Sequence, residues 1–144
     1  MSDTARLRED FQTELRGLLD AMARATSGLA PGPRRLLVGI EAFWEACYRR
    51  RDAAERILQS ARSLDSEQDL ARRALILERL LASELRACGV VAAETLAPDL
   101  AAEIAAVTRA ECFAAQRLPA LRRRLIGFVE SRTGLPSLWT AVAA

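Results

Sequence analysis

Three residue types are absent from this sequence of 144 residues: histidine, lysine and asparagine. Without histidine, the chain lacks the imidazole group that serves proteins most often as a general base and as a metal ligand. The sequence also offers no recognisable pair of nucleophile and base and no set of metal ligands. We therefore expect a protein that is not an enzyme and that has no catalytic residues, no cofactor and no metal site.

The positive charges are all of one kind, because each of the 21 basic residues is an arginine. They nearly balance the 19 acidic residues and leave a net charge of +2. A nucleic-acid binder usually carries a larger positive charge or a dense basic patch. The balance argues against direct, sequence-specific DNA binding, and the arginine runs 49–51 and 122–124 are interpreted as solvated helix ends.

Long apolar runs and a cysteine framework are missing as well. No apolar stretch approaches the roughly 18 residues of a membrane-spanning helix, and the first residues lead directly into charged sequence without a signal segment. The three cysteines, Cys47, Cys88 and Cys112, match neither a disulfide framework nor a zinc pattern. We expect a cytoplasmic protein with no membrane contact, in which the cysteines are small buried side chains.

Apolar residues at spacings of three and four run almost from end to end of the chain, whereas no segment alternates with period two for the length of a strand. This pattern predicts an all-α fold, a single-domain bundle of about six helices. Glycine and proline mark the expected boundaries. The predicted helices run from Asp3 to Ser27-Gly28, from Gly32-Pro33 to the arginines 49–51, briefly from Asp52 onward, from Ser66 to Cys88-Gly89, from Pro98-Asp99 onward, and from Leu118-Pro119 onward.

The last two predicted helices carry more apolar residues than packing against one neighbouring helix requires. The fifth has Leu100, Ile104, Val107 and Phe113. The sixth has one stripe with Leu121, Leu125 and Phe128, and a neighbouring stripe with Ile126 and Val129. Two adjacent stripes on one helix indicate two packing partners.

The segment PGPRRLLVGIEAFWEACYRRRD, residues 31–52, is the strongest candidate for a site. At helical spacing it presents one stripe with Leu36, Ile40, Phe43 and Cys47, and beside it a second with Leu37, Glu41, Trp44 and Tyr48. In one interpretation both stripes are core, with the polar atoms of Trp44 and Tyr48 at its edge. In the other, the second stripe lines a cavity. A carboxylate between apolar rows must be paired, protonated or facing a polar ligand, which lends the cavity some support, but the residues taken alone favour the core.

Two further carboxylates, Glu78 and Glu111, lie on the fourth and fifth predicted helices. Each has an arginine close by in sequence, Arg79 and Arg109, so a solvated or ion-paired carboxylate is the simpler interpretation. Convergence of these groups on one cavity would permit acid–base or metal chemistry, but spacing within single helices does not establish convergence between helices.

Three stretches together resemble the C-terminal ligand-binding and dimerisation domain of TetR-family transcriptional regulators. They are the long first helix leading into PGPRRLLVGIEAFWEACYRRRD and ERILQSARS, the apolar LARRALILERLLASELRACGV, and the closing pair DLAAEIAAVTRAECFAA and LRRRLIGFVESRTG. The resemblance covers residues 5–134. The helix-turn-helix that precedes this domain in the family has no counterpart here, so we expect residues 1–144 to form one TetR-like sensor domain that does not itself read DNA.

The resemblance implies a homodimer that binds an apolar or amphipathic small molecule and that could form a heterodimer with a full-length regulator. The implied ligand-binding residues are Phe11, Met22, Glu41, Trp44, Tyr48, Glu78, Leu81 and Glu111. The implied dimer-interface residues are Ile104, Leu121, Leu125, Phe128 and Val129. The alternative is a structural or adaptor protein with a filled core, which makes protein contacts and binds no ligand.

Overall fold

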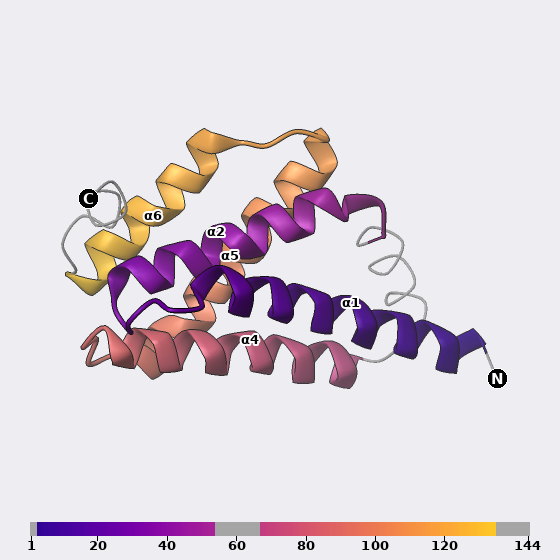
Figure 1. Cartoon of the computed structure of the whole chain (residues 1–144), viewed down its shortest axis with the longest axis horizontal. Coiled ribbons are helices and arrows are strands. Elements are labelled where there is room, and N and C mark those ends of the chain that lie inside the picture. The colour runs from indigo at the N-terminus through magenta and orange to yellow at the C-terminus, as the bar shows by residue number, and fades with distance from the viewer. Residues whose placement is uncertain (1–2, 54–66, 135–144) are drawn as a thin grey trace.

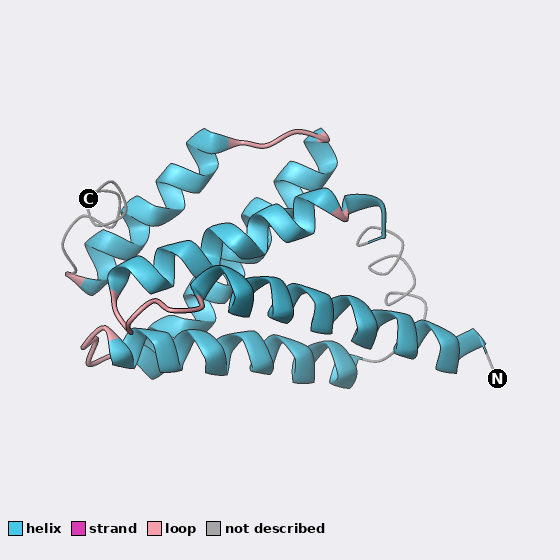
Figure 2. Cartoon of the chain, in the orientation of Figure 1, coloured by secondary structure: helices cyan, strands magenta, loops and turns pink. Residues whose placement is uncertain are grey.

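The computed structural model describes residues 3–53 and 67–134, and within these ranges it contains helices and no strand (Figures 1 and 2). The all-α prediction is confirmed for this part of the chain. The helices are α1 (Asp3–Thr26), α2 (Pro33–Arg49), α4 (Glu67–Ala87), α5 (Ala93–Ala114) and α6 (Pro119–Thr133). Most of the short helix predicted after Asp52 lies outside the described residues.

Glycine and proline set most of the helix boundaries as predicted. Helices α2 and α6 begin at Pro33 and Pro119, where a proline loses only an N–H that has no partner within the helix. Gly28 and Gly89 follow α1 and α4 with φ angles of 80° and 84°, a left-handed conformation that glycine adopts without steric cost.

The predicted start of the fifth helix at Pro98-Asp99 is wrong, because α5 begins five residues earlier, at Ala93, and includes Pro98. Proline inside a helix removes one backbone hydrogen bond and crowds the preceding turn. The residues before it, Ala93, Leu96 and Ala97, are all buried in the core. Burial of this first turn and a half offsets the local cost of the proline.

The predicted place of Phe113 on the buried stripe of α5 is also wrong, because the side chain of Phe113 is 95 % exposed. The buried stripe continues from Ile104 and Val107 to Glu111, which is 1 % exposed. Spacing of four residues from Val107 leads to Glu111, whereas Phe113 projects from a different side of the helix. A carboxylate therefore occupies the position where an apolar side chain was expected.

The helices pack as two pairs joined through α2 and α5. Helix α1 packs against α2, α4 packs against α5, α2 contacts α5, and α6 packs on α5. In Figure 1, α4 lies along the bottom of the molecule and α6 at the upper left. The core lies among α2, α4, α5 and α6, and its largest fully buried apolar side chains are Trp44, Leu37, Ile40, Leu85, Leu100, Ile104, Ile126 and Val129.

Helix α1 lies at the margin of this core. Its apolar side chains Leu15, Leu18, Leu19 and Met22 are only half-buried. The helix approaches α2 closely near Gly39, where an added Cβ would lie 3.5 Å from Thr26 Cγ2. Its apolar face is therefore only partly covered by α2, and the remaining part of that face borders a cavity.

No helix among the described residues is both long enough and apolar enough to cross a membrane.

Candidate functional site

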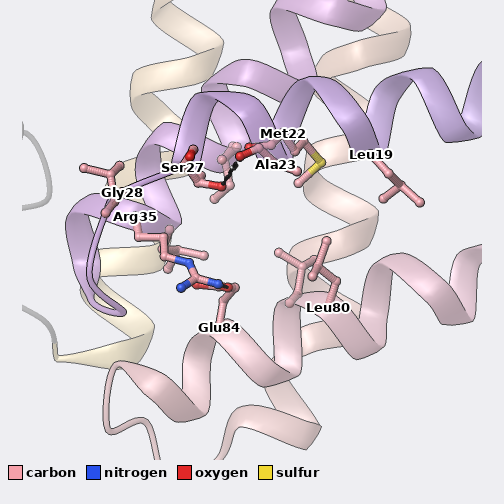
Figure 3. Close-up of a pocket in the computed structure, with 14 residues that line it drawn as sticks. Leu19, Met22, Ala23, Ser27, Gly28, Arg35, Leu80 and Glu84 are labelled. Atoms are coloured by element: carbon pink, nitrogen blue, oxygen red, sulfur yellow. Dashed lines mark hydrogen bonds and ion pairs between the residues drawn. The ribbon is translucent and has the colours of Figure 1, made fainter.

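A cavity of about 480 Å³ lies between α1, α2 and α4 (Figure 3). Its size falls in the range usual for small-molecule pockets, roughly 300–1,000 Å³. The residues that line it are Leu19, Met22, Ala23, Thr26, Ser27, Gly28, Leu29, Arg35, Leu36, Gly39, Ile40, Leu80, Leu81 and Glu84.

The walls of the cavity are mostly apolar. Figure 3 shows Met22 on α1 and Leu80 on α4 pointing into the space between the two helices. Leu36 and Ile40 of α2, both 2 % exposed, contribute to the wall from the core. The exposed residue Ser27 lies on the rim, so the cavity opens to solvent near the end of α1.

One ion pair supplies the charged groups of the cavity. Arg35 Nη2 lies 2.8 Å from Glu84 Oε1, which joins α2 to α4 (Figure 3). The Glu84 side chain is 16 % exposed, and its second oxygen, Oε2, is fully buried with no hydrogen-bond partner among the described residues. A buried polar atom without a partner is uncommon in folded proteins, so this oxygen is an unusual feature of the site.

A second polar cluster lies where α2, α5 and α6 meet, and Glu111 is at its centre. Arg122 Nε donates to Glu111 Oε2 at 2.7 Å, and Arg122 Nη2 donates to Oε1 at 2.8 Å. The backbone N–H of Leu118 donates to the same carboxylate at 2.8 Å. Glu111 therefore fixes the start of α6 against the end of α5, and its partner is Arg122 rather than the predicted neighbour Arg109. The interpretation of Arg122 as part of a solvated helix end is wrong, because its side chain is only 14 % exposed.

Glu45 extends this cluster onto α2. Arg117 donates to both of its carboxylate oxygens, at 2.8 and 3.0 Å, and Arg122 Nη1 donates to Oε1 at 2.9 Å. The hydrogen bonds from Arg117 lower the pKa of Glu45 to about 2, because they favour the ionised form. Burial instead raises the pKa of Glu41, one turn earlier, although Arg122 partly opposes that effect.

The aromatic residues of α2 belong to this end of the helix. Trp44 is fully buried, and its indole N–H donates to the carbonyl of Ile104 at 3.3 Å. The Tyr48 ring has the guanidinium carbons of Arg51 and Arg117 at 4.7 and 4.6 Å from its centre, which is within cation–π range. Both aromatic side chains therefore have partners within the protein, and neither needs a ligand to explain its position.

The structure divides the predicted ligand-binding residues into two groups. Met22 and Leu81 line the cavity. Glu41, Trp44, Tyr48 and Glu111 are absent from its lining and lie toward the opposite end of α2. Glu78 is half-buried and does not line it, and the side chain of Phe11 lies outside what the structure describes.

The sequence prediction missed both charged residues of the cavity, Arg35 and Glu84. Arg35 comes directly after a helix start, and Glu84 follows the apolar run of the fourth helix, so each has the appearance of an ordinary surface charge. Among the residues that line the cavity, the apolar stripe positions, such as Leu36 and Ile40 of α2, carry a signal in the sequence.

The predicted interface residues also lie in two settings. Ile104, Leu125 and Val129 are at most 4 % exposed and belong to the core of the chain itself. Leu121 and Phe128 are half-buried and border a surface hollow of about 430 Å³ between α5 and α6. The buried Leu125 also lines this hollow, but of the five residues only Leu121 and Phe128 are half-buried there.

The prediction of buried cysteines is confirmed for Cys47 alone, because Cys88 and Cys112 are half-buried. Burial raises the pKa of Cys47 to about 12, so its thiol is protonated at neutral pH and is a poor nucleophile. Burial also raises the pKa of Cys88. In residues 3–53 and 67–134, no three histidine, cysteine, aspartate or glutamate side chains gather closely enough to hold a metal ion.

Comparison with models of protein families, with curated proteins and with solved structures finds no match to this chain.

Proposed function

We propose that the chain is a TetR-like sensor domain that binds an apolar or amphipathic small molecule in the cavity between α1, α2 and α4. The observation that carries this proposal is the cavity itself, whose volume is about 480 Å³ and whose walls are apolar apart from one ion pair and a polar rim. Apolar walls with a few placed polar groups are typical of small-molecule sites. The proposed activity is binding rather than catalysis, since the charged groups of the cavity, Arg35 and Glu84, are paired with each other.

Filling the cavity should abolish ligand binding. A ligand that binds only the folded state stabilises it by about 2.7 kcal/mol at a concentration one hundred times its Kd. We expect some members of a panel of hydrophobic compounds to raise the melting temperature of the native chain. The variant Leu80→Trp places a larger side chain in the cavity, and we expect it to lose this response in differential scanning calorimetry.

The control is Ile76→Trp, which makes a similar change one turn earlier on α4, at a side chain that is 44 % exposed and does not line the cavity. This variant should keep the ligand response of the native chain. If no compound in a broad panel shifts the melting temperature of the native chain, the sensor proposal fails and a structural or adaptor role is left.

We also propose that a second copy of the chain covers the hollow between α5 and α6. Its apolar border includes Leu121 and Phe128, and Glu103 and Arg124 on the same border offer charges of both signs to a symmetric partner. A two-fold interface is self-complementary, which suits such a mixed border. The same face would accept a full-length regulator in a mixed dimer, through which the domain would act on transcription.

The variant Phe128→Glu should weaken this dimer at least about tenfold, or by about 1.4 kcal/mol, because it removes an apolar ring from the contact and places a charge there that must lose its water. Sedimentation velocity over a range of concentrations measures the change. The matched control is Phe113→Glu, the same substitution at a side chain that is 95 % exposed. If Phe128→Glu remains as dimeric as Phe113→Glu, the hollow is not the interface.

A further inference from the structure

Two charged side chains of opposite sign line the hollow between α5 and α6. Glu103 lies on α5 and Arg124 lies on α6, and both are exposed. Neither of them has an ion-pair partner in residues 3–53 and 67–134. The other residues that line the hollow are apolar: Ala106, Val107, Leu121, Leu125 and Phe128. The hollow therefore combines an apolar surface with one unpaired acid and one unpaired base.

The register of the two helices keeps these two charges apart within one chain. Helices α5 and α6 are antiparallel neighbours, and Asp99 on α5 lies 3.5 Å from Arg132 on α6 (Figure 1). Glu103 is four residues after Asp99, whereas Arg124 is eight residues before Arg132. Arg124 is thus four residues farther from this ion pair than Glu103 is, or roughly 6 Å at the helical rise. The two side chains do not lie opposite each other, and they do not pair.

Two-fold symmetry removes this mismatch when two chains meet. In a two-fold dimer the same face of each copy takes part, so every contact between two different residues occurs twice. The axis can lie in the plane of this face, midway between Glu103 and Arg124 and perpendicular to the line that joins them. It then places each of the two residues against the opposite charge on the other copy. Both pairs form together, and all four charges have a partner.

We propose that Glu103 of each copy pairs with Arg124 of the partner subunit across the hollow, and that these two pairs set the register of the dimer. The inference rests on the dimer proposed above, because it names the contacts within that interface. Charges at the border of an interface mainly select the partner and its orientation. The apolar residues of the hollow supply the affinity, and the two ion pairs supply the specificity.

The test uses charge reversals and measures dimerisation by sedimentation velocity at low salt. Glu103→Arg brings two positive side chains together at each contact, and Arg124→Glu brings two negative ones together. We expect each variant to dimerise at least about tenfold more weakly than the native chain, because like charges that face each other across an interface repel. The matched control is Arg123→Glu, at an exposed residue of α6 that does not line the hollow. It should stay within about threefold of the native chain.

A mixture of the two variants gives the sharpest measurement. In a mixed dimer, one chain brings only positive side chains to the two contacts and the other brings only negative ones, so both contacts are attractive again. An equimolar mixture of Glu103→Arg and Arg124→Glu should therefore dimerise within about threefold of the native chain. The double variant Glu103→Arg/Arg124→Glu should do the same. High salt should reduce the differences among all these samples, because it screens exposed charges.

Several outcomes would overturn the pairing. It is wrong if the mixture dimerises as weakly as the separate variants, or if either single reversal leaves the dimer unchanged. Recovery in the double variant without recovery in the mixture would show that the two charges act within one chain, which also contradicts it.

The variant Phe128→Glu tests the dimer itself separately. If Phe128→Glu weakens the dimer and the charge reversals do not, the hollow is the interface and only the pairing fails. If the native chain is monomeric at every concentration, the proposed dimer fails and the pairing fails with it. Neither result bears on ligand binding in the cavity between α1, α2 and α4, which the thermal shifts decide.

Discussion

Substitution of Arg122 by methionine is expected to lower the free energy of unfolding by about 3–5 kcal/mol, because it removes the partner of a buried carboxylate. Glu111 is 1 % exposed and accepts two hydrogen bonds from Arg122, at 2.7 and 2.8 Å. Without the arginine, the carboxylate keeps only the backbone N–H of Leu118. Small domains are stable by only about 5–15 kcal/mol, so this loss is a large part of the total.

Urea denaturation followed by circular dichroism measures the effect of Arg122→Met. The control is Arg123→Met on the same helix, where the side chain is exposed, and we expect a change within about 0.5 kcal/mol. In the double variant Glu111→Leu/Arg122→Met both charges are gone, and much of the lost stability should return, because an apolar pair can replace a buried ion pair. A loss below about 1 kcal/mol for Arg122→Met would show that Glu111 is not buried against the arginine in solution.

Substitution of Trp44 by alanine is expected to cost about 3–5 kcal/mol, the loss usual for a large aromatic side chain in a close-packed core. The ring is fully buried and belongs to the apolar core, and its N–H donates to the carbonyl of Ile104. Trp44 does not line the cavity between α1, α2 and α4. If the ring faced open space instead, the loss would be only about 1–2 kcal/mol.

The same denaturation experiment separates these two outcomes. Phe113→Ala is the control, since it truncates an aromatic side chain that is 95 % exposed, and it should change stability by less than about 0.5 kcal/mol. Ligand binding offers a second measurement. At temperatures where Trp44→Ala is folded, it should bind the compounds that bind the native chain, because the cavity is built from other residues. Loss of binding in the folded variant would place Trp44 at the ligand site after all.

Local sequence signals were sufficient for most of the helices. The spacing of apolar residues predicted an all-helical chain, and Pro33, Pro119, Gly28 and Gly89 marked helix ends that the structure confirms. These signals work because they act within one or two helical turns, through the fixed φ of proline and the left-handed conformation open to glycine. The signal failed at Pro98, where burial of the residues before it outweighs the local cost of proline within the helix.

The candidate site depended far more on tertiary structure. Helical spacing placed Glu41, Trp44 and Tyr48 on one stripe of α2, but it could not say which helices that stripe would face. In the structure this end of α2 meets α5 and α6, and the cavity lies toward its other end. A stripe that contacts neighbouring helices along its whole length has the same sequence pattern as one that lines a cavity.

The sequence by itself determined that the described part of the chain is built of helices, and it placed Leu36 and Ile40 on an apolar stripe that proves to line the cavity. Only the tertiary structure decided which charges meet: Arg35 with Glu84 across α2 and α4, and Glu111 with Arg122 across α5 and α6. The physical reason is one of range. Helix formation is governed by residues three or four apart, whereas these ion pairs join residues 49 and 11 positions apart, which only the packing of whole helices brings together.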